Sequence, residues 1–140
     1  MTITIYHNPA CGTSRNTLGL IRNTGAEPLI VDYLSNPPTH EALAAMITAA
    51  GLTVREAIRS KEARYQELGL DDASLSDQAL LDAMVANPVL INRPFVVTPN
   101  GARLCRPSEL VLDLLAAPHQ GPFTKEDGEI VIDASGQPVK

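Results

Sequence analysis

Aromatic side chains are scarce in this chain of 140 residues, which has no tryptophan, two phenylalanines and three tyrosines. Surfaces that bind single-stranded nucleic acid stack bases on aromatic rings, so this composition argues against such a surface. Positive charge is scarce as well, and the formal net charge of −5 disfavours non-specific binding to a phosphate backbone. We therefore expect no nucleic-acid partner.

The sequence contains no long hydrophobic run, and we expect no secretory leader. No apolar stretch approaches the length that a membrane-spanning helix needs. The first residues lead directly into a predicted strand, which is unlike a signal peptide. Because 44% of the residues are hydrophobic, the chain can bury a sizeable core. We expect one compact domain over residues 1–140 and no membrane partner.

Cysteine occurs only twice, at Cys11 and Cys105. Two cysteines are too few for an exported disulfide scaffold and make no convincing metal site. We therefore expect no bound metal or cofactor and a location in the reducing cytoplasm.

Cys11 stands where a predicted strand passes into a predicted helix. Residues 2–6 alternate apolar and polar side chains, residues 7–10 form a turn, and helical spacing runs from Gly12 to a stop at Gly25. A lone cysteine is most often a small buried hydrophobic residue. At a helix N-terminus, however, unpaired N–H groups and the helix dipole favour the thiolate, which is the nucleophilic form. This position indicates that Cys11 is a reactive nucleophile beside an anion site.

Three neighbours of Cys11 bear on its reactivity. Ser14 lies one turn along the helix and can present its hydroxyl to the sulfur, Arg15 adds positive charge, and His7 adds a cation when protonated. Ser14 also occupies the place of the second sulfur of a redox Cys-x-x-Cys motif. An oxidised Cys11 must therefore be resolved by an outside thiol or by Cys105.

The order of predicted elements indicates an α/β fold. A second strand at 28–33 follows the first helix, and only helices are predicted from about 37 to 88. Asn100-Gly101 then predicts a hairpin between strands at 95–98 and 102–105. A helix beginning at Pro107 and a short strand at 129–133 complete the chain.

A β-α-β unit followed by a hairpin and a helix is typical of a thioredoxin-like fold, with a small mixed four-stranded sheet flanked by helices. Here it carries an inserted helical subdomain at about residues 37–88. In that fold a proline before the third strand, commonly cis, lies near the cysteine that opens the first helix. Pro94 stands in this place, so we expect Arg93 to face Cys11.

Arginine is common, with eight residues against three lysines. Its planar fork of donors suits tetrahedral oxyanions. Arg93 and Arg106 each precede a proline at a strand end, whereas spacing alone does not place Arg59 with them. For the remaining arginines outside the Cys11 loop we expect solvated surface charges: Arg22, Arg55, Arg64 and Arg103.

Several stretches together resemble one family. They are residues 3–18 (ITIYHNPACGTSRNTL), 65–70 (YQELGL), 91–99 (INRPFVVTP), 103–109 (RLCRPSE) and 123–129 (FTKEDGE). In this order they resemble the glutaredoxin- and glutathione-dependent arsenate reductases, over nearly the whole chain.

The resemblance implies a function and a set of site residues. It implies that Cys11 is catalytic, that His7 and Ser14 favour its thiolate, and that Cys105 is dispensable. The implied oxyanion-binding residues are Arg59, Arg93 and Arg106. The implied reaction reduces arsenate to arsenite through a thiol–arsenate adduct, with glutathione as co-substrate and glutaredoxin as partner.

Other functions remain open. Related regulators use this fold to sense oxidation and contact RNA polymerase, typically through Cys-x-x-Cys, which Ser14 argues against. An enzyme of the same fold could act on another oxyanion or as a general thiol reductase. A cysteine phosphatase is disfavoured because only three residues separate Cys11 from Arg15, too few for a phosphate loop.

Overall fold

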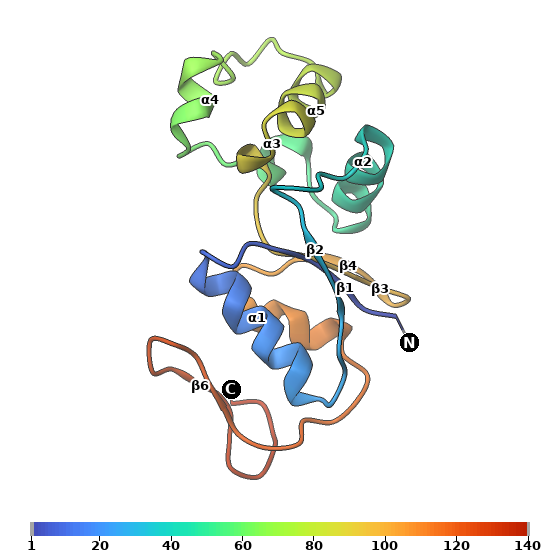
Figure 1. Ribbon diagram of the computed structural model, residues 1–140, viewed down its shortest axis with the longest axis vertical. Coiled ribbons are helices and arrows are strands. Elements are labelled where there is room, and N and C mark those ends of the chain that lie inside the picture. The colour runs from blue at the N-terminus through green and yellow to red at the C-terminus, as the bar shows by residue number, and fades with distance from the viewer. Residues whose placement is uncertain (1, 140) are drawn as a thin grey trace. The chain divides into compact units, whose positions relative to one another are not determined.

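A computed structural model describes residues 2–139 of the chain (Figure 1). The chain divides into two compact units: one joins the residues up to Val31 with those from Arg93 onward, and the other spans Asp32–Asn92. Among the described residues, no helix is both long enough and apolar enough to cross a bilayer.

A four-stranded mixed sheet has the strand order β2-β1-β3-β4. Its strands are β1 (Thr4–His7), β2 (Leu29–Asp32), β3 (Phe95–Thr98) and β4 (Gly101–Leu104). Strands β1 and β3 are antiparallel, as are β3 and β4. Thr98 pairs with Gly101, which confirms the predicted Asn-Gly hairpin, although β4 begins and ends one residue earlier than predicted.

Two helical segments pack against this sheet and against each other. Helix α1 (Gly12–Asn23) contacts β1, while the segment η2 (Ser108–Leu114) contacts both β4 and α1. In Figure 1, α1 is blue and η2 is orange. Their apolar residues share one core with the sheet, which includes Ile5, Leu20, Ile21, Val96, Cys105, Val111 and Leu114. The chain thus has the predicted thioredoxin-like α/β fold.

The helix predicted after β4 is present, and it is a 3₁₀ helix. We expected it to begin at Pro107; η2 begins one residue later, with Pro107 as its N-cap. Its buried residues are Ser108, Val111 and Leu114, one in every three. This spacing is that of a 3₁₀ helix, in which side chains three apart line up on one face. The apolar residues of the segment fit the spacing of an α-helix as well as that of a 3₁₀ helix, so packing decided which of the two helix types formed.

Two short strands end the described chain, β5 (Phe123–Thr124) and β6 (Ile130–Ile132). Strand β6 confirms the predicted strand near 129–133, whereas β5, its antiparallel partner, was not predicted. Phe123 packs closely on α1 at Gly19, where a Cβ would lie 2.6 Å from the phenyl ring. Glycine at this position therefore permits the C-terminal hairpin to contact α1.

The second unit is helical, as the sequence predicts for this part of the chain. It contains α2 (His40–Ala49), α3 (Val54–Ala57), α4 (Ala63–Glu67), α5 (Asp77–Ala86) and the 3₁₀ turn η1 (Pro88–Leu90). Side chains of Thr39 and Ser76 cap α2 and α5 by accepting backbone N–H bonds. Thr53 and Glu56 form a reciprocal capping box at α3. Serine and threonine are typical N-cap residues, so the sequence itself marks these helix starts.

Arg55 is not the solvated surface charge that we expected. Its guanidinium donates to the Tyr65 hydroxyl at 2.9 Å and to the carbonyl oxygens of Leu70 and Asp72. It thereby links α3 to α4 and to the loop that follows. Every residue has a backbone carbonyl, so the sequence does not indicate which ones will accept from Arg55. The linking role of Arg55 therefore could not be predicted without the fold.

Replacing Arg55 by methionine should therefore destabilise the protein. The variant keeps the aliphatic stem but leaves three acceptors without their donor, and we expect a loss of about 1–2 kcal/mol in the free energy of unfolding. Arg64→Met, which removes only the exposed pair with Glu67, serves as the control and should cost less than about 0.5 kcal/mol. Urea unfolding compares the two, and equal losses would contradict this structural role for Arg55.

Candidate functional site

Cys11 is the N-cap of α1, as the sequence predicts. Its backbone is extended, with φ −100° and ψ 121°, and its N–H donates to the Asn8 carbonyl at 3.0 Å. The Cys11 carbonyl in turn accepts from the Arg15 N–H, the first hydrogen bond of the helix. The cysteine is 8% exposed, so its sulfur lies in a largely enclosed place at a helix start.

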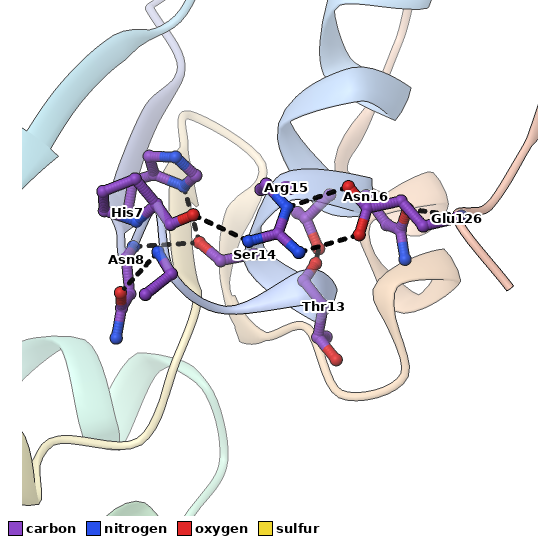
Figure 2. A network of polar contacts seen from close by, with 10 residues as sticks. His7, Asn8, Thr13, Ser14, Arg15, Asn16 and Glu126 are labelled. Carbon is purple, nitrogen blue, oxygen red and sulfur yellow. Dashed lines mark hydrogen bonds and ion pairs between the residues drawn. The ribbon is translucent and has the colours of Figure 1, made fainter.

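The turn before Cys11 is held by side chains. Figure 2 shows the Ser14 hydroxyl in contact with both His7 and Asn8. Its Oγ accepts from the Asn8 N–H at 3.0 Å and lies 2.6 Å from the His7 Nδ1. The Asn8 side chain accepts from the Ala10 N–H at 3.0 Å. The structure thus brings His7 and Ser14 together, and it places the Ser14 hydroxyl on the turn rather than on the sulfur.

The pKa of the Cys11 thiol lies below its ordinary value because three groups outweigh the effect of burial. Burial by itself raises the pKa, since it disfavours the charged thiolate. The backbone N–H of Ser14, the charge of Arg93, and the hydrogen bond and charge of Arg106 lower it. Ser14 therefore stabilises the thiolate through its main chain.

Arg93 and Arg106 both act on Cys11, Arg106 by direct contact and Arg93 through its charge. The Arg106 Nη1 lies 3.7 Å from the Cys11 sulfur and donates to the Arg93 carbonyl at 3.1 Å. The peptide bond between Arg93 and Pro94 is cis, as expected, and so is that between Arg106 and Pro107. The first unit thus gathers a thiolate, two guanidinium groups and the N–H groups of a helix start, a combination suited to a tetrahedral oxyanion.

Arg59 belongs to the second unit. Its guanidinium lies 3.4 Å from a carboxylate oxygen of Glu62 and donates to the Val89 carbonyl, and its own N–H donates to the Leu90 carbonyl. These contacts fix Arg59 beside η1 and leave part of its side chain accessible, at 21% exposure.

Two residues of the Cys11 surroundings were missed by the sequence analysis. Asn8 precedes Pro9 and folds the turn with its side chain, a role that its residue type could have suggested. Glu126 accepts two hydrogen bonds from Arg15, at 2.8 and 2.9 Å, although 111 positions separate the two residues. No local pattern marks a partner so distant in the sequence.

Cys105 differs from Cys11 in its surroundings and in the pKa of its thiol. It is fully buried in the core and, like Cys11, has no disulfide partner. Burial raises the pKa of its thiol to about 12, against a smaller opposing effect of the Arg103 charge.

Within residues 2–139 no three His, Cys, Asp or Glu side chains are grouped to hold a metal ion.

Alkylation should therefore modify one thiol per folded chain. At pH 7 we expect iodoacetamide to react with Cys11 and not with Cys105, because the pKa of Cys11 is lowered whereas burial raises that of Cys105. Lowering the pH protonates Cys11 and slows the reaction.

Arg106→Met should raise the pKa of Cys11 and slow alkylation at pH 7 about threefold. Arg103→Met removes an arginine paired with Asp113 and is the control; identical pH profiles for both variants would contradict the role of Arg106.

Comparisons with known proteins agree with one another. The model of the ArsC family matches residues 6–114. A relative from Rhizobium meliloti (strain 1021), named arsenate reductase, is 66% identical over 99% of both chains. Another arsenate reductase, from Escherichia coli (strain K12), is 54% identical over 99% of this chain and 98% of its own.

Solved structures give the same result. The arsenate reductase from Vibrio cholerae superimposes with a TM-score of 0.79 at 46% identity, covering 82% of this chain and 98% of its own. The putative arsenate reductase from Yersinia pestis gives 0.76 at 46% identity, over 79% and 98% of the two chains. On its sequence and on its structure, this chain belongs to the ArsC family.

Proposed function

We propose that this protein is an arsenate reductase that converts arsenate to arsenite and so serves arsenic detoxification. The observation that carries the proposal is the Cys11 sulfur, whose pKa is lowered and which lies 3.7 Å from the Arg106 guanidinium. Relatives of 66% and 54% identity that bear the name arsenate reductase support it. Both cysteines are free thiols, which agrees with a cytoplasmic setting.

Arsenate would first bind as an oxyanion in front of Cys11. Guanidinium groups present paired N–H donors that match the oxygens of a tetrahedral anion. Arg93 and Arg106 are the candidates within the first unit, together with the N–H groups at the start of α1. For Arg59 the same role is proposed on the family resemblance.

The chemical step begins with a nucleophilic attack by Cys11. Its thiolate forms a sulfur–arsenic bond, and one arsenate oxygen leaves as hydroxide or, after protonation, as water. The thiolate is the reacting form, so the groups that lower the pKa of Cys11 raise the reactive fraction at neutral pH. His7 and Ser14 would support this step by holding the turn from which the sulfur projects.

Glutathione would supply the reducing equivalents. Its thiolate attacks the Cys11 sulfur of the adduct, the sulfur–arsenic bond breaks, and its electron pair stays on arsenic, which becomes trivalent arsenite. The two sulfurs form a mixed disulfide, so two electrons leave the thiols and reach arsenic. Glutaredoxin then frees Cys11 by thiol–disulfide exchange.

An external thiol fits the chain because neither internal candidate can resolve Cys11. Position 14 carries a hydroxyl instead of a sulfur. Cys105 is buried, and its pKa of about 12 keeps it protonated at neutral pH. The thiolate is required for exchange, so an internal disulfide route is disfavoured.

The first test measures arsenite formed from arsenate by wild type and by Cys11→Ser, with glutathione, glutaredoxin and a reduced-nicotinamide recycling system. We expect turnover by wild type alone, and loss of turnover when glutaredoxin is omitted. Failure of wild type to turn over arsenate, with Cys11 still alkylated rapidly, would refute the reductase proposal in favour of another oxyanion or a regulatory role.

A second variant separates the external from the internal route. Cys105→Ala should retain more than about half of the wild-type turnover, because the buried thiol takes no part in the proposed steps. Circular dichroism and the thermal midpoint provide the control for folding. A folded Cys105→Ala protein without activity would show that Cys105 takes part in resolving Cys11.

A further inference from the structure

The turn of the C-terminal hairpin, which joins β5 to β6, contacts two distant segments through adjacent residues. Lys125 Nζ lies 3.2 and 3.3 Å from the two carboxylate oxygens of Glu109, at the start of η2. Glu126 accepts both hydrogen bonds from Arg15 in α1, and its own N–H donates to the Asn16 side chain at 3.1 Å. Figure 2 shows the contacts of Glu126 with Arg15 and Asn16.

These two segments are the ones that bring the reacting groups together. Arg15 follows Cys11 by one helical turn, and Glu109 follows Arg106 by three residues. Cys11 and Arg106 are 95 positions apart, yet Nη1 and Sγ are 3.7 Å apart. Their separation therefore depends on how α1 and the start of η2 are held relative to each other.

We propose that Lys125 and Glu126 are positioning residues of the Cys11 site. Together they tie the N-terminus of α1 to the N-terminus of η2, and so keep the Arg106 guanidinium against the Cys11 sulfur. The inference deepens the proposed function where it concerns arsenate, while its effect on the thiolate stands without any substrate.

The contact made by Glu126 also reaches the turn that carries Cys11. The guanidinium of Arg15 that Glu126 holds donates from Nη1 to the Pro9 carbonyl at 2.8 Å. Pro9 lies within the turn that Asn8 and Ser14 fold. Glu126 thus orients the Arg15 side chain, which bonds both the hairpin and this turn. Without the Glu126 carboxylate, the Arg15 guanidinium is no longer held in that orientation.

The hairpin presents Lys125 in a defined direction. The Lys125 N–H donates to the Glu129 carbonyl, and the Gly128 N–H donates back to the Lys125 carbonyl, with Gly128 at φ +94°. The Lys125 ammonium also pairs with Glu129 at 2.9 Å, and its side chain is only 11% exposed. The tight turn and the pair with Glu129 fix the Lys125 ammonium that holds Glu109.

Reactivity and stability should respond differently if the proposal is right. Glu126 and Arg15 are about half exposed, at 52% and 43% of their side chains. Exposed ion pairs contribute little to folding stability. Small displacements of groups around a reacting atom, by contrast, cost large factors in rate. If the pair were purely structural, its removal would change neither the reactivity of the Cys11 thiolate nor the turnover.

The test compares Glu126→Ala with a matched control, Glu27→Ala. Glu27 accepts two hydrogen bonds from Arg22 at 2.8 and 2.9 Å, so the control removes an equivalent exposed pair near the other end of α1. Three quantities are measured on the full chain: the pH profile of Cys11 alkylation without arsenate, kcat and KM for arsenate, and the thermal midpoint. Glu126→Gln, which keeps one acceptor oxygen, provides a graded rescue.

We expect Glu126→Ala to slow Cys11 alkylation at pH 7 about threefold, with its pH profile moved to higher pH. We expect kcat/KM for arsenate to fall about tenfold, with Glu126→Gln intermediate and Glu27→Ala like wild type. Lys125→Met should act in the same direction. All variants should keep thermal midpoints within a few degrees of wild type.

The proposal is overturned when Glu126→Ala and Glu27→Ala share the wild-type alkylation profile, or when reactivity falls only in proportion to lost thermal stability. Because alkylation needs no arsenate, this outcome is independent of whether wild type reduces arsenate. A wild type without arsenate turnover would refute the proposed function alone, and the alkylation profiles would still decide the role of the hairpin.

Discussion

The contact between the Arg106 guanidinium and the Cys11 sulfur is the interaction on which the site depends. A sulfur enclosed in protein normally loses its charge, because burial removes the water that stabilises a thiolate. Here the Ser14 N–H, the Arg93 charge and the Arg106 guanidinium replace that water and lower the pKa of the thiol. The same donors suit the oxygens of an anion, so one arrangement prepares the nucleophile and its substrate site.

Cys105 shows what the same side chain does without such partners. It lies among the apolar residues of the core, and burial raises the pKa of its thiol to about 12. The two cysteines have the same side chain, and their different surroundings give their thiols different pKa values. One is placed for thiolate reactions, and the other fills space between the sheet and η2.

Long-range contacts of modest energy gather around Cys11. Helix α1, the residues just before β3, the residues just after β4, and the turn between β5 and β6 come from separate parts of the chain. Their meeting is fixed by the shared core and by ion pairs such as those of Lys125 and Glu126. The exposed pair of Glu126 contributes little to stability, but together such pairs set the separations on which a nucleophile depends.

The sequence by itself determined what depends on neighbouring residues: the start of α1 at Cys11, the caps at Thr39, Thr53 and Ser76, and the Asn-Gly hairpin. Tertiary structure decided the rest. Packing selected a 3₁₀ rather than an α-helix for η2, made Arg55 a half-buried link between α3 and α4, and paired Glu126 with Arg15. Local patterns encode backbone preferences over a few residues, whereas a contact across 95 or 111 positions exists only once the core has brought its partners together.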